Sequence, residues 1–118
     1  MDGPRVLVVD DEVDFVQTLL KRLKRKGADC EGVFSGAGAL DALSRRSFDV
    51  VLLDMKLNKE DGNEVLGQIK ALWPDVRVVV LTGHASASAG RVSLGSGAAD
   101  YLIKPVDFES LFAKITGA

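Results

Sequence analysis

Short apolar runs recur along the chain, and they constrain its fold more than any other feature of the sequence. Four of them stand out, at 6–9, 50–53, 76–81 and 101–103. Three of these are rich in β-branched residues and nearly continuous, which is typical of strands that are covered on both faces. A weaker run at 30–34 lies between the first two and predicts an edge strand.

The stretches between these runs carry helical periodicity. Apolar residues at helical spacing predict helices around 13–23, 39–43, 65–72 and 108–115. Gly27 is a stop signal for the first of these helices, Pro74 ends the third, and Asp107 is the expected N-cap of the last. The segment 86–97 must also cross from one strand to the next, and its Ser, Gly and Ala content predicts a helix of low intrinsic propensity.

Strand and helix therefore alternate five times, which predicts an α/β fold with a parallel sheet and helices on both of its faces. A length of 118 residues suits one domain, so we expect a single domain over 1–118, with residues 1–4 disordered. The order of the strands does not follow from the periodicity.

Composition excludes several classes of protein. One cysteine, Cys30, leaves no disulfide framework and no CxxC zinc site. A net charge of −2 argues against nucleic-acid binding by the chain as a whole. The longest apolar runs, of about five residues, are too short to cross a membrane, and no signal-peptide pattern is visible, so we expect a cytoplasmic protein.

Polar residues follow the predicted strands at the points where the strands end. They are Asp10 and Asp11, Asp54, Thr82 and Gly83, and Lys104 and Pro105. In a parallel sheet these positions lie at one edge, the carboxyl edge, where open α/β folds bind their ligands. We therefore expect carboxylates, a hydroxyl and an ammonium group to converge there from separate segments of the chain.

Ionised carboxylates that lie so close together repel one another unless a cation neutralises them. Oxygen ligands without a cluster of Cys or His favour a hard cation, Mg²⁺ or Mn²⁺. The Lys104 ammonium and the Thr82 hydroxyl could hold phosphoryl oxygens beside such an ion. The group therefore predicts phosphoryl chemistry, and an Asp carboxylate is the candidate nucleophile because the sequence has no P-loop motif.

Several segments carry a resemblance to a known family. They are Val8-Val9-Asp10-Asp11-Glu12, Val51-Leu52-Leu53-Asp54-Met55 with Gly62 beyond, Val80-Leu81-Thr82-Gly83, and Asp100-Tyr101-Leu102-Ile103-Lys104-Pro105. In this order they resemble the receiver domain of bacterial two-component response regulators, the chemotaxis regulator among them, over essentially the whole chain. The resemblance implies a flavodoxin-like fold, with a doubly wound five-stranded parallel sheet in the order 2-1-3-4-5.

The resemblance also assigns roles to the acidic residues. Asp54 is the implied phosphoacceptor, which takes a phosphoryl group from a histidine of a sensor kinase. Asp11 is the implied direct ligand of Mg²⁺, and Asp10 a second acidic group that orients the ion or its water. The backbone carbonyl of Lys56 is a further implied ligand.

The remaining residues are assigned to the phosphoryl group and to switching. Lys104 is implied to pair with the phosphoryl oxygens, and its bond to Pro105 to be cis. Thr82 resembles the switch hydroxyl that moves toward the phosphoryl group, and Tyr101 the aromatic residue that then turns inward. Such a domain changes the face that its partners bind and turns over no separate substrate, so we do not expect an enzyme.

The implied partners are a sensor histidine kinase or a phosphotransfer protein, and a downstream effector domain or protein. Direct nucleic-acid binding and membrane association are not expected of the domain, whereas homodimers through the switch face are common in the family. The last helix, which ends near Ala118, is short for the family, which indicates a piece of a longer protein.

The sequence departs from the family pattern at a few positions. Asn58 stands where the family usually has Pro, and Gly83 replaces the commoner Ala, which would widen access to the phosphoryl group. Lys56 and His84 occupy the two variable positions that flank the site. Because either could alter the approach of water, the lifetime of the phosphorylated state stays open.

Each residue also has a simpler interpretation. Asp10 and Asp11 could only cap the first helix, Asp54 could be a turn residue, and Lys104 a solvated lysine. Tyr101 could be half-buried strand packing. A basic run at 21–26 favours a solvated helix face over a binding patch.

Other functions also stay open for the chain as a whole. A pseudo-receiver that acts only as a protein-interaction module would have the same fold. A hydrolase with an Asp nucleophile would need a general acid two residues after Asp54, where Lys56 is a poor candidate. A flavin-binding relative is disfavoured because acidic strand ends repel a phosphate group in the absence of a metal ion.

Overall fold

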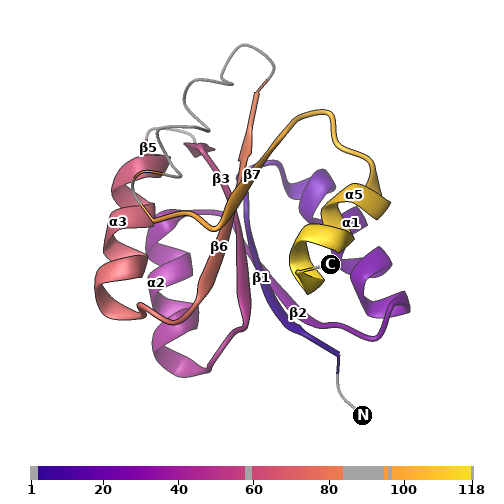
Figure 1. Ribbon diagram of the computed structural model, residues 1–118, viewed down its shortest axis with the longest axis horizontal. Coiled ribbons are helices and arrows are strands. Elements are labelled where there is room, and N and C mark those ends of the chain that lie inside the picture. Colours follow the sequence, from indigo (N-terminus) through magenta and orange to yellow (C-terminus); the bar gives the residue numbers. More distant parts are fainter. Residues whose placement is uncertain (1–2, 58–59, 84–94, 96, 118) are drawn as a thin grey trace.

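The computed structural model describes residues 3–57, 60–83, 95 and 97–117. One parallel sheet forms its centre, with helices on both faces (Figure 1). The helices α1 (Val13–Arg25) and α5 (Phe108–Thr116) cover one face, and α2 (Gly36–Arg45) and α3 (Gly62–Leu72) cover the other (Figure 1). The expected α/β class with helices on both faces is confirmed.

The sheet contains five strands, all of them parallel to their neighbours. The strands are β1 (Arg5–Val9), β2 (Asp29–Val33), β3 (Val50–Asp54), β6 (Arg77–Thr82) and β7 (Asp100–Ile103). Their order is β2-β1-β3-β6-β7, which is the expected 2-1-3-4-5 when the sheet strands alone are counted. The weak run around Cys30 is the edge strand that its composition predicted.

The central strands have continuous apolar sequences because both of their faces are buried. In β1, Leu7 and Val9 pack with α2 and α3, whereas Val6 and Val8 pack with α1 and α5. β3 is buried along its entire length. Two cores, one on each side of the sheet, therefore fix the positions of the strand ends.

Side-chain caps set the starts of the helices. The Ser35 hydroxyl accepts a hydrogen bond from the backbone N–H of Gly38 (3.0 Å) at the start of α2. The expected cap of α5 is confirmed, because the Asp107 carboxylate accepts from the backbone N–H of Ser110 (3.0 Å). These hydrogen bonds satisfy donors that a helix leaves unpaired in its first turn.

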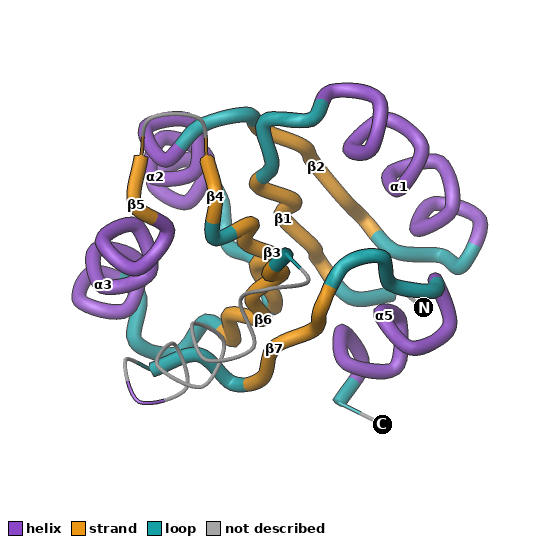
Figure 2. Tube along the Cα trace, turned by 90° about the horizontal axis from the view of Figure 1, so that it is seen from above, coloured by secondary structure: helices purple, strands orange, loops and turns teal. Residues whose placement is uncertain are grey.

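A small antiparallel hairpin follows β3 and was not predicted from the sequence. It consists of β4 (Lys56–Leu57) and β5 (Glu60–Asp61) and lies beside α2 and α3 (Figure 2). The Glu60 carboxylate accepts a hydrogen bond from the backbone N–H of Gly36 (2.9 Å), which ties the hairpin to the start of α2.

Two sequence-based expectations concern residues that are described only in part. The helix expected at 86–97 lies outside the described residues, except for 95 and 97. Of the N-terminal residues expected to be disordered, 1 and 2 lie outside the described part, while the Pro4 carbonyl accepts a hydrogen bond from the backbone N–H of Asp29 (3.0 Å). Within the described residues, no helix has both the length and the apolar character that crossing a membrane requires.

Candidate functional site

The register of the sheet brings the predicted site residues to one edge. Val9 of β1 pairs with Leu53 of β3, so Asp10 and Asp54 follow at the same level. On the other side of the sheet centre, Thr82 of β6 pairs with Ile103 of β7, and Lys104 comes directly after that pair. Parallel pairing alone therefore places these side chains at the carboxyl edge, as the sequence predicted.

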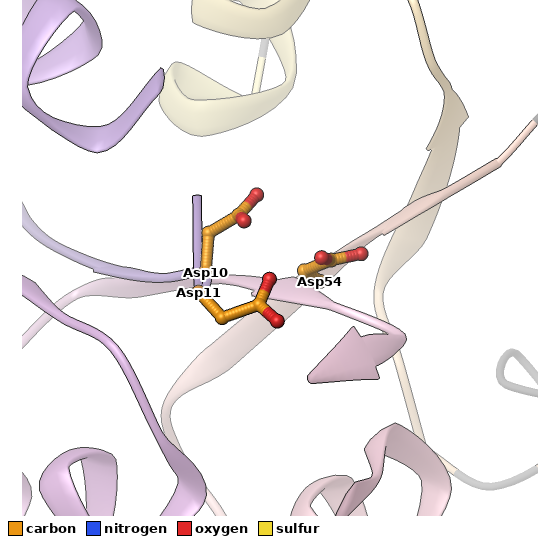
Figure 3. A group of neighbouring side chains, drawn as sticks. All are labelled: Asp10, Asp11 and Asp54. Atoms are coloured by element: carbon orange, nitrogen blue, oxygen red, sulfur yellow. The ribbon is translucent and has the colours of Figure 1, made fainter. Parts of the chain in front are cut away.

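Three carboxylates meet at the ends of β1 and β3 (Figure 3). One carboxylate oxygen from each of Asp10, Asp11 and Asp54 lies within 4.8 Å of the others. Asp10 is fully buried, Asp54 is 5% exposed and Asp11 is half-buried. So many buried anionic oxygens at one point are costly without a positive charge among them.

Lys104 supplies such a charge from the end of β7. Its Nζ lies 2.8 Å from Asp10 Oδ2, 3.3 Å from Glu12 Oε1 and 3.7 Å from Asp54 Oδ2. Burial lowers the pKa of Lys104, but its hydrogen bond to Asp10 and the attraction of Asp54 outweigh burial and hold that pKa above its ordinary value. The ammonium group is therefore charged throughout the neutral pH range.

The environment of Asp54 opposes its ionisation. Burial, followed by repulsion from Asp10, raises the pKa of Asp54 to about 6, although Lys104 and the backbone N–H of Lys56 favour the charged form. That N–H donates to Asp54 Oδ1 at 3.2 Å. A carboxylate in this state is ionised at neutral pH yet poorly compensated, which suits a group that reacts with an electrophile or binds a cation.

Thr82 carries a buried hydroxyl that has no hydrogen-bond partner among the described residues. Buried hydroxyls are nearly always paired, and an unpaired one costs free energy. Such a group next to the acidic cluster is suited to an additional ligand with acceptor oxygens.

The other predicted residues have different surroundings. Tyr101 is half-buried and packs against the core on the α2–α3 side of the sheet. Gly83 and Pro105 are exposed, and the Lys104–Pro105 peptide bond is cis, as the resemblance implied. The Lys56 side chain is exposed, so its expected contribution to a metal site would come from the backbone carbonyl.

The donor set fits a hard divalent cation. It offers carboxylate oxygens, and neither Cys nor His takes part among the described residues of the cluster. The ammonium of Lys104 and the unpaired hydroxyl of Thr82 could hold an oxyanion beside that cation.

Two residues beside Lys104 were missed from the sequence. Glu12 contacts its ammonium, and the ring centroid of Phe15 lies 4.7 Å from its Nζ. The helix-cap interpretation of Asp10 is wrong, because Glu12 is the N-cap of α1 and Asp10 Oδ1 accepts only from the backbone N–H of that residue (2.9 Å), before the helix begins. The position of Glu12 at the N-cap of α1, directly after the acidic pair, is the signal that could have identified it.

Comparison with known proteins agrees with this geometry. Residues 6–116 match the family described as "Response regulator receiver domain". Among curated proteins, the transcriptional regulatory protein ZraR of Escherichia coli O157:H7 is 38% identical over 117 residues, which cover 99% of this chain and 26% of ZraR. The chain thus spans about a quarter of the length of this relative.

Solved structures show the same architecture. NtrX from Brucella abortus matches with a TM-score of 0.92 and 31% identity, over 100% of this chain and 27% of that one. A response regulator from Burkholderia pseudomallei, described with a phosphorylated aspartic acid, a calcium ion and citrate, matches with a TM-score of 0.88 and 31% identity. That match covers 96% of this chain and 66% of the other.

Proposed function

The chain belongs to the response regulator receiver family of two-component systems, and from this premise we propose that Asp54 accepts a phosphoryl group from a sensor histidine kinase or a phosphotransfer protein. The observation that carries the proposal is the position of Asp54. Its buried carboxylate shares a 4.8 Å cluster with Asp10 and Asp11 and lies 3.7 Å from the Lys104 ammonium.

The acidic residues would hold the metal ion that this transfer requires. Asp10, Asp11, Asp54 and the backbone carbonyl of Lys56 are the proposed holders of Mg²⁺, with Mn²⁺ as a substitute. When bound, the ion offsets the charge of the carboxylates and of the phosphoryl oxygens. Asp10 also keeps its contact with Lys104, so it would orient the site more than it binds directly.

The chemical step is a transfer between two nucleophiles. An ionised oxygen of Asp54 bonds to phosphorus as the P–N bond of the donor's phosphohistidine breaks, and the imidazole nitrogen keeps the bonding electron pair. Lys104 would pair with the phosphoryl oxygens as negative charge gathers on them. Water later attacks phosphorus and returns the free carboxylate and inorganic phosphate, so the domain turns over no separate substrate.

The signal would leave the site through Thr82 and Tyr101. The unpaired Thr82 hydroxyl can donate to a phosphoryl oxygen that Asp54 acquires. Movement of β6 at Thr82 would free space for Tyr101, which is now half-buried on the neighbouring strand β7. Phosphorylation would in this way reset the face that partners bind.

The relatives suggest what receives the signal. ZraR and NtrX are about four times longer than this chain, so we propose an effector domain or a separate effector protein as the output. The receiver domain itself would act in the cytoplasm without binding nucleic acid or membranes, and dimerisation through the switch face is a further option. The phosphorylated aspartic acid and calcium ion described for the Burkholderia protein support the proposed chemistry.

The test uses phosphoramidate, a small donor with a P–N bond, together with Mg²⁺. Intact mass should show one acid-labile phosphoryl group on the wild-type chain and none on Asp54→Asn. An adduct that persists in Asp54→Asn would exclude Asp54 as the acceptor. If no adduct forms and Mg²⁺ leaves the Asp11 and Asp54 resonances unmoved, the chain is a pseudo-receiver that serves only as an interaction module.

A further inference from the structure

The segment between β1 and α1 holds the ammonium group of Lys104 more closely than the proposed phosphoacceptor does. Lys104 Nζ donates hydrogen bonds to Asp10 (2.8 Å) and to Glu12 (3.3 Å). Its distance from Asp54 is 3.7 Å, which is an ion pair without a hydrogen bond. The resting position of the ammonium is therefore displaced toward α1.

Besides Asp10 of the acidic cluster, two side chains at the start of α1 contact the ammonium group, those of Glu12 and Phe15. Glu12 occupies the N-cap position of α1, but its side chain makes no capping hydrogen bond and reaches Lys104 instead. Phe15, one turn further along the helix, places its ring centroid 4.7 Å from Lys104 Nζ, within the range of a cation–π contact. Glu is not among the residues that favour the N-cap position, so the contact of Glu12 with Lys104 costs α1 no favourable capping hydrogen bond.

We propose that Glu12 and Phe15 form a resting position for the Lys104 ammonium and compete for it with a phosphoryl group on Asp54. They are positioning residues, because they act on the phosphoryl group only through Lys104. The proposal rests on the proposed function, in which Lys104 pairs with phosphoryl oxygens. Any contact that Lys104 makes only before phosphorylation favours the unphosphorylated state, and its removal should favour the phosphorylated one.

Beryllofluoride, which binds carboxylates as a phosphoryl analogue, is the probe for this competition. Mg²⁺ is raised for each variant until further Mg²⁺ no longer changes the signal, so that altered metal affinity does not enter the result. We expect Glu12→Gln to bind beryllofluoride about twofold to fivefold more tightly than wild type, which is the range for one partly exposed ion pair. Phe15→Leu, which keeps an apolar side chain, should change the affinity in the same direction.

Asp14→Asn is the matched control. Asp14 is an exposed carboxylate in the first turn of the same helix, so its removal changes the net charge equally. The ¹⁵N resonance of the Lys104 ammonium, recorded without metal ion, reports the contact itself. It should shift in Glu12→Gln and stay in place in Asp14→Asn.

The outcomes separate this proposal from the proposed function. If wild type binds beryllofluoride and Glu12→Gln matches Asp14→Asn in affinity, the competition does not exist, while the phosphoacceptor role stands. If wild type binds no beryllofluoride at saturating Mg²⁺, the proposed function and the competition are both wrong. Tighter binding by Glu12→Gln, together with the shifted Lys104 resonance, would support the competition.

Discussion

Asp10 directly follows β1 and Asp54 ends the neighbouring strand β3, and the buried carboxylate of Asp10 is one of the causes that raise the pKa of Asp54 to about 6. Burial of Asp54 is the larger cause. The same two strands that bring the carboxylates together to bind a cation therefore also make their ionisation costly when no cation is bound.

The first prediction concerns this titration. In the metal-free protein, the ¹³C resonance of the Asp54 carboxyl group should titrate with a midpoint near pH 6, the value set by burial and Asp10. Asp10→Asn should lower that midpoint, because one source of repulsion is lost. Asp107, whose pKa its hydrogen bonds to Ser110 hold below the ordinary value, serves as an internal reference. A midpoint for Asp54 at or below that of Asp107 would contradict the prediction.

The second prediction is that Asp54 destabilises the metal-free fold at neutral pH. A carboxyl group with a raised pKa keeps its proton longer in the folded state than in the unfolded state. The contribution of Asp54 to the free energy of unfolding should therefore fall as pH rises from about 3.8 to about 6, and stay reduced above that range. Asp54→Asn should unfold at a higher urea concentration than wild type at pH 7.5. The corresponding free energy of unfolding should be higher by on the order of 1–3 kcal/mol. The two proteins should become similar in stability below pH 4, and a pH-independent difference would refute the assignment.

The third prediction reverses this destabilisation with metal. Mg²⁺ that binds the folded acidic cluster should raise the free energy of unfolding by about 2.7 kcal/mol at a concentration one hundred times its Kd. The thermal midpoint should rise with Mg²⁺ concentration, and a chelator should restore the original value. Asp11→Asn should lose most of this response, because one carboxylate of the cluster becomes a neutral amide. Equal responses in both proteins would exclude Asp11 as a ligand.

Much of this site follows from the sequence, because parallel strands place their carboxyl ends at one edge. That rule sufficed to bring Asp10, Asp54, Thr82 and Lys104 together, and the family resemblance supplied the strand order. The contact of Glu12 with Lys104 did not follow, since it depends on how far two long side chains reach between segments 92 residues apart.

The hairpin after β3 could not be predicted from the sequence for a different reason. Each of its strands is two residues long, which is too short to show a period of alternation. Its position is set by tertiary contacts instead, among them the hydrogen bond from the Gly36 N–H to Glu60. Contacts of this kind have no signature in the local sequence.

The fourth prediction separates the effect of the Thr82 hydroxyl on the stability of the protein from its role in switching. Thr82→Val removes a buried hydroxyl that is unpaired among the described residues, so the free energy of unfolding should stay the same or rise by about 1 kcal/mol. Beryllofluoride should then no longer shift the ring resonances of Tyr101, which is the only tyrosine of the chain. Thr82→Ser, which keeps the hydroxyl, is the control and should retain the shift. A full Tyr101 response in Thr82→Val would show that switching does not pass through this hydroxyl.

The last prediction concerns Gly62, which begins α3 directly after the hairpin. A Cβ added at Gly62 would lie 2.5 Å from the Met55 Cα and 2.6 Å from its carbonyl oxygen, and backbone atoms cannot move aside cheaply. The Gly62 N–H also donates to that carbonyl at 3.1 Å, one residue beyond Asp54.

Gly62→Ala should therefore lower the free energy of unfolding by about 1–3 kcal/mol. It should also slow phosphorylation, because the loop beside the acceptor must shift. Gly67→Ala in the same helix is the matched control, since a Cβ there meets no described atom within 4 Å. Because Ala forms helices better than Gly, this control should raise the free energy of unfolding by roughly 0.5–1 kcal/mol without changing the phosphorylation rate. In urea unfolding, Gly62→Ala should be less stable than Gly67→Ala. If it is not, the close approach of the Met55 backbone to Gly62 does not constrain this position.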